Sequence, residues 1–147
     1  MLKVYLDAST KGNPGPSGGG IVIVGTDLHE QIAFPLPDST NHQAEFAVMV
    51  NALQLLIDKG LQEQTIMLYT DSKVVAQTID KNYTKNPAFS DYLTEIQYLL
   101  KQFALAIIQW VPESQNKGAD HLARQGLAKA MKLKDRRPVS YTHLRAH

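Results

Sequence analysis

Two short apolar runs that each lead into an aspartate most constrain how this chain folds. Asp7 follows residues 2–6, and Asp71 follows residues 66–70. Such runs predict central strands of a sheet that is covered on both faces. An aspartate at the end of a buried strand loses hydration, which is unfavourable unless a cation compensates it. If the two strands are neighbours, their carboxylates meet, and a bound metal ion or a raised pKa is the usual outcome.

The composition is that of a globular domain without a membrane segment. The 147 residues predict one domain with a substantial core, and they are 44% hydrophobic and 20% charged. No apolar stretch reaches about 18 residues and no basic segment leads into one at the N-terminus, so we expect neither a membrane helix nor a signal peptide. The chain has no cysteine, which excludes disulfides and thiolate zinc sites and fits a cytoplasmic location.

The formal net charge of +1 combines two unlike parts of the chain. Residues 132–147 carry five Lys and Arg against one acid, whereas residues 1–131 carry ten against thirteen, a net charge of −3. A mildly acidic body provides no general basic field for nucleic acid. Any binding of nucleic acid would therefore depend on local contacts and on bound divalent cations.

The apolar periodicity predicts a mixed sheet flanked by helices. Strands are expected at residues 2–7, 20–25, 30–36, 65–70 and 105–111, and helices at about residues 41–60, 72–79, 90–103 and 120–131. The short spacing of the second and third strands predicts an antiparallel hairpin, and a helix between two strands predicts parallel neighbours.

Residues 8–20 are rich in Gly, Pro and Ser and predict a loop with tight turns. Its glycines would allow the backbone to approach a ligand closely. The alternative is that this loop only connects two strands. At the other end, residues 133–147 show no helical or strand period. We expect residues 1–132 to form the domain and residues 133–147 to be a non-native or disordered tail. The alternative is a native basic tail that contacts phosphates.

Glu45 lies one turn inside the first predicted helix, on the same stripe as Val48, Ala52 and Leu56. A carboxylate on an apolar stripe is unusual without a partner. The alternative is a glutamate at the edge of the stripe that reaches solvent. His42 and His121 are expected at the surface, and Trp110 is expected in the core.

These elements carry a series of motifs in a specific order. The motifs are Asp7 leading into Gly-Asn-Pro-Gly-Pro at 12–16, Thr40-Asn41 before Glu45, Thr70-Asp71-Ser72, Trp110-Val111-Pro112, and Asn116 to Ala123 around Asp120. Over residues 2–131 the chain resembles the ribonuclease H type 1 family. The resemblance implies an α/β, ribonuclease H-like fold whose five-stranded mixed sheet has three antiparallel strands, then two parallel ones.

The resemblance also implies an activity. Asp7, Glu45, Asp71 and Asp120 would be catalytic and would bind two Mg²⁺ or Mn²⁺ ions. The enzyme would be an endoribonuclease that cuts the RNA strand of RNA–DNA hybrids and leaves 5′-phosphate and 3′-hydroxyl ends. Hard divalent cations prefer oxygen ligands, and two ions roughly 4 Å apart suit an in-line displacement at phosphorus.

Further positions match substrate contacts of the family. They are Gly12, Asn13, Gly15, Thr40, Asn41, Ser72, Lys73 and Asn116. By resemblance, Asn13 and Asn41 would contact 2′-hydroxyls, the group that distinguishes RNA from DNA, and Thr40 would contact a phosphate of the DNA strand. Lys73 stands where better-known members often have Gln, and its charge suits a phosphate.

Two departures from the family pattern matter. The loop after Trp110 lacks the histidine of many members, and Glu113 is the nearest ionisable residue that would replace it. Residues 80–89 hold only two lysines where many members have a basic protrusion, so we expect modest, salt-dependent affinity for hybrid.

Other functions stay open at this point. One alternative is a non-catalytic or weakly active nucleic-acid-binding member of the fold, and another is a resolvase or exonuclease of the wider superfamily. We expect RNA–DNA hybrid as the partner, no membrane association, and a monomer, with a dimer as the alternative.

Overall fold

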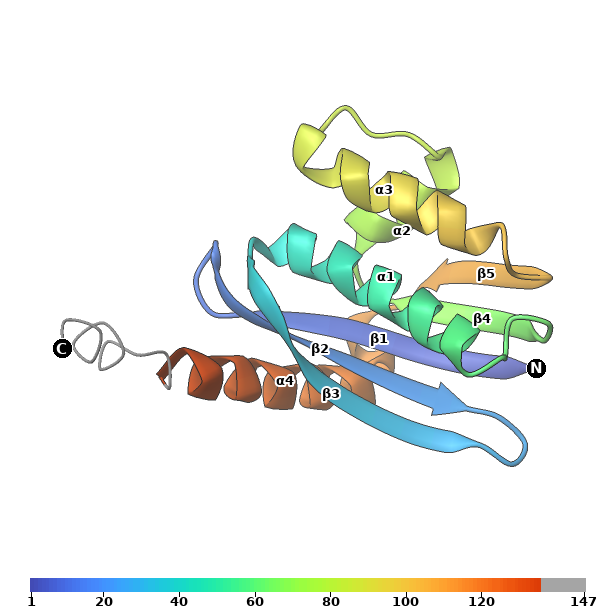
Figure 1. Cartoon of the computed structure of the whole chain (residues 1–147), viewed down its shortest axis with the longest axis horizontal. Helices are drawn as coiled ribbons and strands as arrows, with labels where there is room; N and C mark the ends of the chain where they lie inside the picture. Colours follow the sequence, from blue (N-terminus) through green and yellow to red (C-terminus); the bar gives the residue numbers. More distant parts are fainter. Residues whose placement is uncertain (136–147) are drawn as a thin grey trace, which may run out of the picture.

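The computed structural model describes residues 1–135 and contains one five-stranded sheet (Figure 1). The elements are β1 (Leu2–Thr10), β2 (Gly15–Val24), β3 (His29–Ser39), α1 (Asn41–Asp58), β4 (Thr65–Thr70), α2 (Lys73–Lys81), α3 (Pro87–Leu100), β5 (Leu105–Trp110), the short 3₁₀ helix η1 (Glu113–Gln115) and α4 (Lys117–Asp135). The strand order is β3-β2-β1-β4-β5. β1, β2 and β3 pair antiparallel, and β4 pairs parallel with β1 and β5. The predicted mixed sheet is therefore confirmed.

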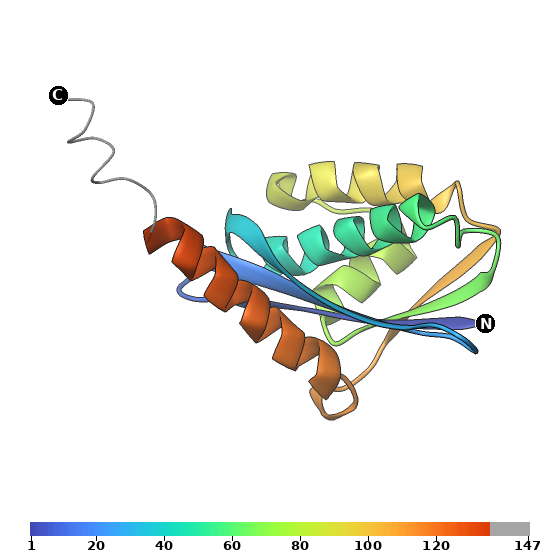
Figure 2. The ribbon, with the colours of Figure 1, turned by 60° about the horizontal axis from the view of Figure 1, so that its bottom comes forward.

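The helices form layers on both sides of this sheet. α1, α2 and α3 lie over one face and α4 crosses the other (Figures 1 and 2). The core lies under α1, where Phe46, Leu53 and Leu56 are fully buried. Val4, Leu6, Ile66 and Leu68 of the two central strands meet them from the sheet. Within residues 1–135 no helix is long and apolar enough to span a membrane.

The opposite face of the central strands is less covered than the sequence predicts. α4 packs mainly on β1, β2 and β3. Tyr5 of β1 and Tyr69 of β4 are therefore only partly buried, and their rings stack with centroids 4.8 Å apart. The apolar runs identified the strands correctly but not this open part of the sheet.

The loop predicted at residues 8–20 is wrong for most of its length. The β1–β2 ladder continues through the pairs Ala8–Gly19, Ser9–Gly18 and Thr10–Ser17, which leaves only residues 11–14 between the strands. The glycines serve helix packing here. A Cβ on Gly18 would lie 1.9 Å from the backbone nitrogen of Leu127, so only glycine lets α4 lie this close to β2.

α4 is longer than the predicted helix at both ends. It begins at Lys117 and continues to Asp135, so residues 133–135 of the expected tail are helical. Near its end Lys134 pairs with Asp38 of β3. The rest of the expected tail, residues 136–147, lies outside the described residues.

Candidate active site

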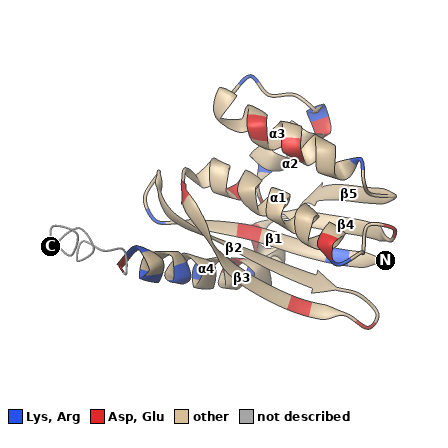
Figure 3. Cartoon of the chain, viewed as in Figure 1, with Lys and Arg blue, Asp and Glu red and all other residues tan. Residues whose placement is uncertain are grey.

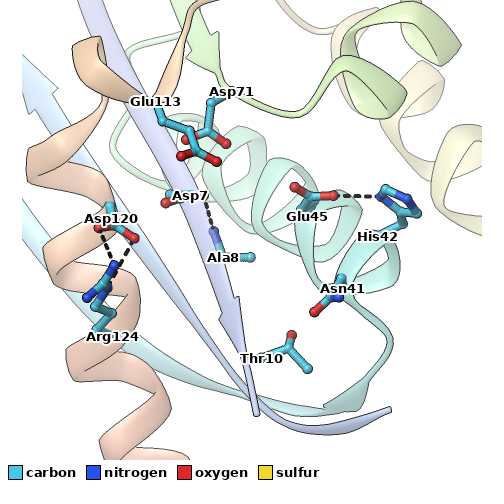
Figure 4. A pocket seen from close by; sticks show the side chains of 10 residues that line it. All are labelled: Asp7, Ala8, Thr10, Asn41, His42, Glu45, Asp71, Glu113, Asp120 and Arg124. Atoms are coloured by element: carbon cyan, nitrogen blue, oxygen red, sulfur yellow. Dashed lines mark hydrogen bonds and ion pairs between the residues drawn. The ribbon is translucent and has the colours of Figure 1, made fainter. Parts of the chain in front are cut away.

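One open pocket collects all four of the predicted catalytic side chains. It lies where the pairing of β1 with β4 stops, because Leu6 pairs with Thr70 and the next residues are Asp7 and Asp71. Figure 4 shows the side chains that line it. They are Asp7, Ala8, Thr10, Asn41, His42, Glu45, Asp71, Glu113, Asp120 and Arg124. The structure thus brings together all four predicted carboxylates, from two neighbouring strands and from two helices on opposite faces of the sheet.

Asp7 and Asp71 form the centre of the pocket. Burial, followed by repulsion from Asp71, raises the pKa of Asp7 from 3.8 to about 8, although a hydrogen bond from the Ala8 amide opposes the change. Burial also raises the pKa of Asp71, and repulsion from Glu113 adds to it. A hydrogen bond from Asn116 Nδ2 to Asp71 Oδ2, 3.2 Å long, works in the opposite direction. The protein itself therefore leaves these two charges poorly compensated.

The outer carboxylates each have a basic partner on their own helix. His42 Nδ1 lies 2.9 Å from Glu45 Oε1 on α1. On α4, Arg124 holds both oxygens of Asp120, with Nε 3.3 Å from Oδ1 and Nη2 3.2 Å from Oδ2. The Glu45 side chain is 22% exposed. It therefore has a partner, as a carboxylate on an apolar stripe requires, and it also reaches solvent, which was the alternative.

Sequence reasoning missed both of these partners. His42 is at the surface as expected, with a 53% exposed side chain, but it lines the pocket and contacts Glu45. Arg124 was not singled out at all. The signal was present, because residues three or four positions apart on a helix are neighbours.

The predicted substrate contacts divide into buried and accessible residues. Asn116 is 1% exposed and donates to the Leu6 carbonyl at 2.9 Å as well as to Asp71. Ser72 is 5% exposed and caps α2 by accepting from the Val75 amide. Gly15 is buried as well. The side chains of Asn116 and Ser72 therefore support the site through these hydrogen bonds, and a contact of the three residues with substrate stays a prediction.

Of the accessible predicted contacts, Asn41 lines the pocket, and Gly12, Asn13 and Thr40 are close to pocket residues in the sequence or in contact with them. The Asn41 amide donates to Asn13 Oδ1 at 3.0 Å, which ties the turn after β1 to the start of α1. Thr40 caps α1 in a capping box with Gln43. Gly12 adopts the left-handed conformation, with a φ of 84°, in the same turn as Asn13.

Trp110 is not a core residue as the sequence suggested. It is 37% exposed, and its Nε1 donates to the backbone oxygen of Asp71 at 3.1 Å. Lys73 Nζ lies 5.1 Å from the centroid of its ring, a cation–π geometry. Trp110 therefore fixes the backbone that carries Asp71 and places Lys73 beside the site.

The donor set fits hard divalent cations. Carboxylate oxygens are the ligands that Mg²⁺ and Mn²⁺ prefer, and the raised pKa of Asp7 reflects surroundings that disfavour its charged form, which a bound cation would favour. Within residues 1–135 no three acidic or histidine side chains already converge as tightly as a metal cage requires. Binding of an ion therefore requires rearrangement of side chains, above all of the paired Glu45 and Asp120.

Comparisons with known proteins agree with this geometry. A family model for RNase H matches residues 1–147. The chain is 53% identical over 129 residues to "Putative hydrolase EbsB" of Enterococcus faecalis, a match that covers 88% of this chain and 96% of that protein.

Two solved structures share the fold. RNase H1 from the archaeon Halobacterium salinarum superposes with a TM-score of 0.80 at 30% identity, over 88% of this chain and 98% of that one. LC11-RNase H1 in complex with RNA/DNA hybrid superposes with a TM-score of 0.81 at 23% identity, over 89% and 99%, and this likeness shows the fold alone. The family model matches the chain, a relative matches it over 96% of that relative's length, and the pocket holds four carboxylates. The chain therefore belongs to the RNase H family.

Proposed function

We propose that this protein is a ribonuclease H that hydrolyses the RNA strand of RNA–DNA hybrids with two divalent metal ions and leaves 5′-phosphate and 3′-hydroxyl ends. The observation that carries the proposal is the pocket in which Asp7 and Asp71 meet between Glu45 and Asp120. Family membership and the hybrid bound to a protein of the same fold support the choice of substrate.

The proposed division of labour follows from the contacts. Ions held by the four carboxylates would supply an activated water and would stabilise the departing 3′-oxygen. Asp7 and Asp71, the least compensated acids, would contribute the central ligands. Asn116 and Trp110 keep Asp71 in place through its carboxylate and its backbone oxygen. Such support from surrounding hydrogen bonds keeps ligands in the required orientation.

Selectivity for RNA is assigned to the rim next to Glu45. Asn41 lines the pocket, and its backbone amide donates to the side-chain oxygen of Asn13, so the two residues are neighbours beside the pocket. Amides can both donate to and accept from a 2′-hydroxyl. Lys73, held beside Trp110, is assigned to a backbone phosphate.

A second candidate is a weakly active member that binds nucleic acid. It is favoured by η1, which presents Glu113 to the pocket where many members have a histidine. Glu113 adds negative charge beside Asp71 and lacks the imidazole ring that a histidine would supply. Turnover slower than that of histidine-containing relatives is the expected result.

The test compares labelled RNA–DNA hybrid, double-stranded RNA and double-stranded DNA, each with Mg²⁺, Mn²⁺ or EDTA. We expect cleavage of the hybrid alone, dependent on the ion, with products that a 3′-hydroxyl-dependent polymerase extends. Binding without cleavage would favour the second candidate, and cleavage of DNA would indicate a different nuclease of the superfamily.

Asp71→Asn is the matched variant for this assay. Because it removes a charge from the centre of the pocket, hybrid cleavage should fall at least about a thousandfold, a loss typical of a principal electrostatic contributor. Its circular dichroism should match that of the unchanged protein. Full activity in this variant would refute the assignment of the site.

A further inference from the structure

The ion pair between Asp120 and Arg124 stands where the proposed function needs a free carboxylate. Arg124 contacts both oxygens of Asp120, at 3.3 and 3.2 Å. In Figure 4 the pair faces the pocket from α4, across from Glu45 and His42. An Asp120 side chain held in this way has no oxygen left that is free of the guanidinium.

Among residues 1–135, Arg124 is also the only Lys or Arg that lines the pocket. A divalent cation that approached Asp120 would repel the guanidinium at short range. The pair can separate readily, because its side chains are 73% and 41% exposed and exposed i,i+4 pairs are weak. A released arginine at this place would meet the phosphates of any strand entering the pocket, which its planar fork suits.

We infer that Arg124 is a positioning residue that exchanges partners. Without metal it holds the Asp120 carboxylate, and when a divalent ion takes Asp120 it turns to a phosphate of the bound strand. The inference rests on the proposed function, because it assumes that Asp120 binds the ion. In the metal-free pocket, Arg124 supplies the positive charge beside Asp120. Binding of the ion then releases Arg124, so that ion binding and the contact with substrate are coupled.

A spectroscopic test follows Arg124 without any need for activity. In protein labelled with ¹⁵N, the Nε–H signal of Arg124 is assigned as the one missing from Arg124→Gln. Saturating Mg²⁺ should move this signal to the position that it has in metal-free Asp120→Asn. A signal that stays in place under saturating Mg²⁺ would overturn the inference.

Binding measurements supply the second test. Mn²⁺ affinity, read from the paramagnetic resonance of free Mn²⁺, should rise several-fold in Arg124→Gln, because the competitor for Asp120 is gone. Arg124→Lys keeps the charge but not the two-pronged contact, and its affinity should lie between the two. Lys117→Gln removes one charge from the same helix at a residue outside the pocket lining, and its Mn²⁺ affinity should change less than twofold.

The same variants should respond in the opposite direction toward the substrate. Arg124→Gln should raise KM for hybrid by about tenfold, the loss expected for one charge-assisted hydrogen bond, with a smaller change in kcat. If unchanged protein binds Mn²⁺ and cleaves hybrid but Arg124→Gln binds Mn²⁺ no more tightly, only the exchange is refuted. If unchanged protein neither binds Mn²⁺ nor cleaves hybrid, the proposed function itself fails.

Discussion

At the scale of single residues, Asp7 is the group whose chemistry differs most from its behaviour in water. Its pKa of about 8 against an ordinary 3.8 means that the folded protein binds a proton there that the unfolded chain has released. Between these two values, the folded state therefore loses stability as the pH rises. The stabilising contribution is complete below about pH 4 and is lost by about pH 8.

Asp7→Asn should consequently stabilise the metal-free protein at pH 8 and change it far less at pH 5, where Asp7 is already protonated. The gain at pH 8 should be roughly 1–3 kcal/mol, measured by urea unfolding in EDTA. Asp91→Asn on the exposed side of α3 is the control, because it removes the same charge from a position outside the pocket. Equal effects of Asp7→Asn at both pH values would contradict the burial argument.

Addition of Mg²⁺ should reverse this order of stabilities at pH 8. An ion that binds only the folded state stabilises it by mass action, and the unchanged protein offers one more central carboxylate than the variant. We therefore expect Mg²⁺, added until its effect is saturated, to raise the Tm of the unchanged protein and to leave that of Asp7→Asn nearly constant. A rise of equal size in both would remove Asp7 from the ligand set.

At the scale of elements, the close packing of β2 against α4 fixes where Asp120 lies. A Cβ on Gly20 would come within 2.3 Å of the backbone oxygen of Ala119, the residue before Asp120. Gly20 also pairs with Asp7 across the ladder. The glycines of β2 therefore set the separation of two carboxylates that are proposed to be catalytic, while contributing no chemistry of their own.

Gly18→Ala should push α4 away from the sheet, because the added methyl group would meet the Leu127 backbone nitrogen. A loss of about 2 kcal/mol or more in unfolding free energy is expected, in the range of overpacked cores. Gly118→Ala is the matched control, since its methyl group would find only Val22 Cγ2 at an ordinary 3.7 Å. Equal stability of the two variants would show that α4 is free to shift.

The same elements show what sequence reasoning can reach and where it stops. Leu2–Leu6 and Ile66–Thr70 revealed their strands because burial on the helical face demands apolar residues at alternate positions. Gly18 and Gly20 were misread as loop, since glycine in a strand makes sense only once the helix packed against it is known. The convergence of the four acids was predicted through the family motifs, whereas the partners His42 and Arg124 depend on side-chain directions that a linear pattern does not specify.

At the scale of the whole molecule, positively charged residues are few for a protein that is proposed to bind a polyanion. Figure 3 shows Lys and Arg gathered along α4, with few on α1, α2 and α3. Three of those on α4 are already engaged, Lys129 with the Ala33 carbonyl, Lys134 with Asp38 and Arg124 with Asp120. In the proposed function, contact with phosphates would therefore fall to isolated residues such as Lys73 and to Arg124 once it is released.

Hybrid binding should accordingly show a shallow dependence on salt. With two or three phosphate contacts, the logarithm of the affinity should fall against the logarithm of the KCl concentration with a slope of about −2 to −3. Fluorescence anisotropy with a labelled hybrid and Ca²⁺ in place of Mg²⁺ measures this slope. A slope steeper than about −5 would point to a basic surface that residues 1–135 do not present.

The position of α4 determines when the pocket is completed during synthesis of the protein. Asp7 is synthesised before Asp120, and Asp120 arrives on α4, which must cross the far side of the sheet before the four acids meet. A nascent chain that has already folded β1 to β5 therefore still lacks one wall of its pocket. The proposed cleavage of RNA can therefore begin only after α4 has been synthesised and has packed against the sheet.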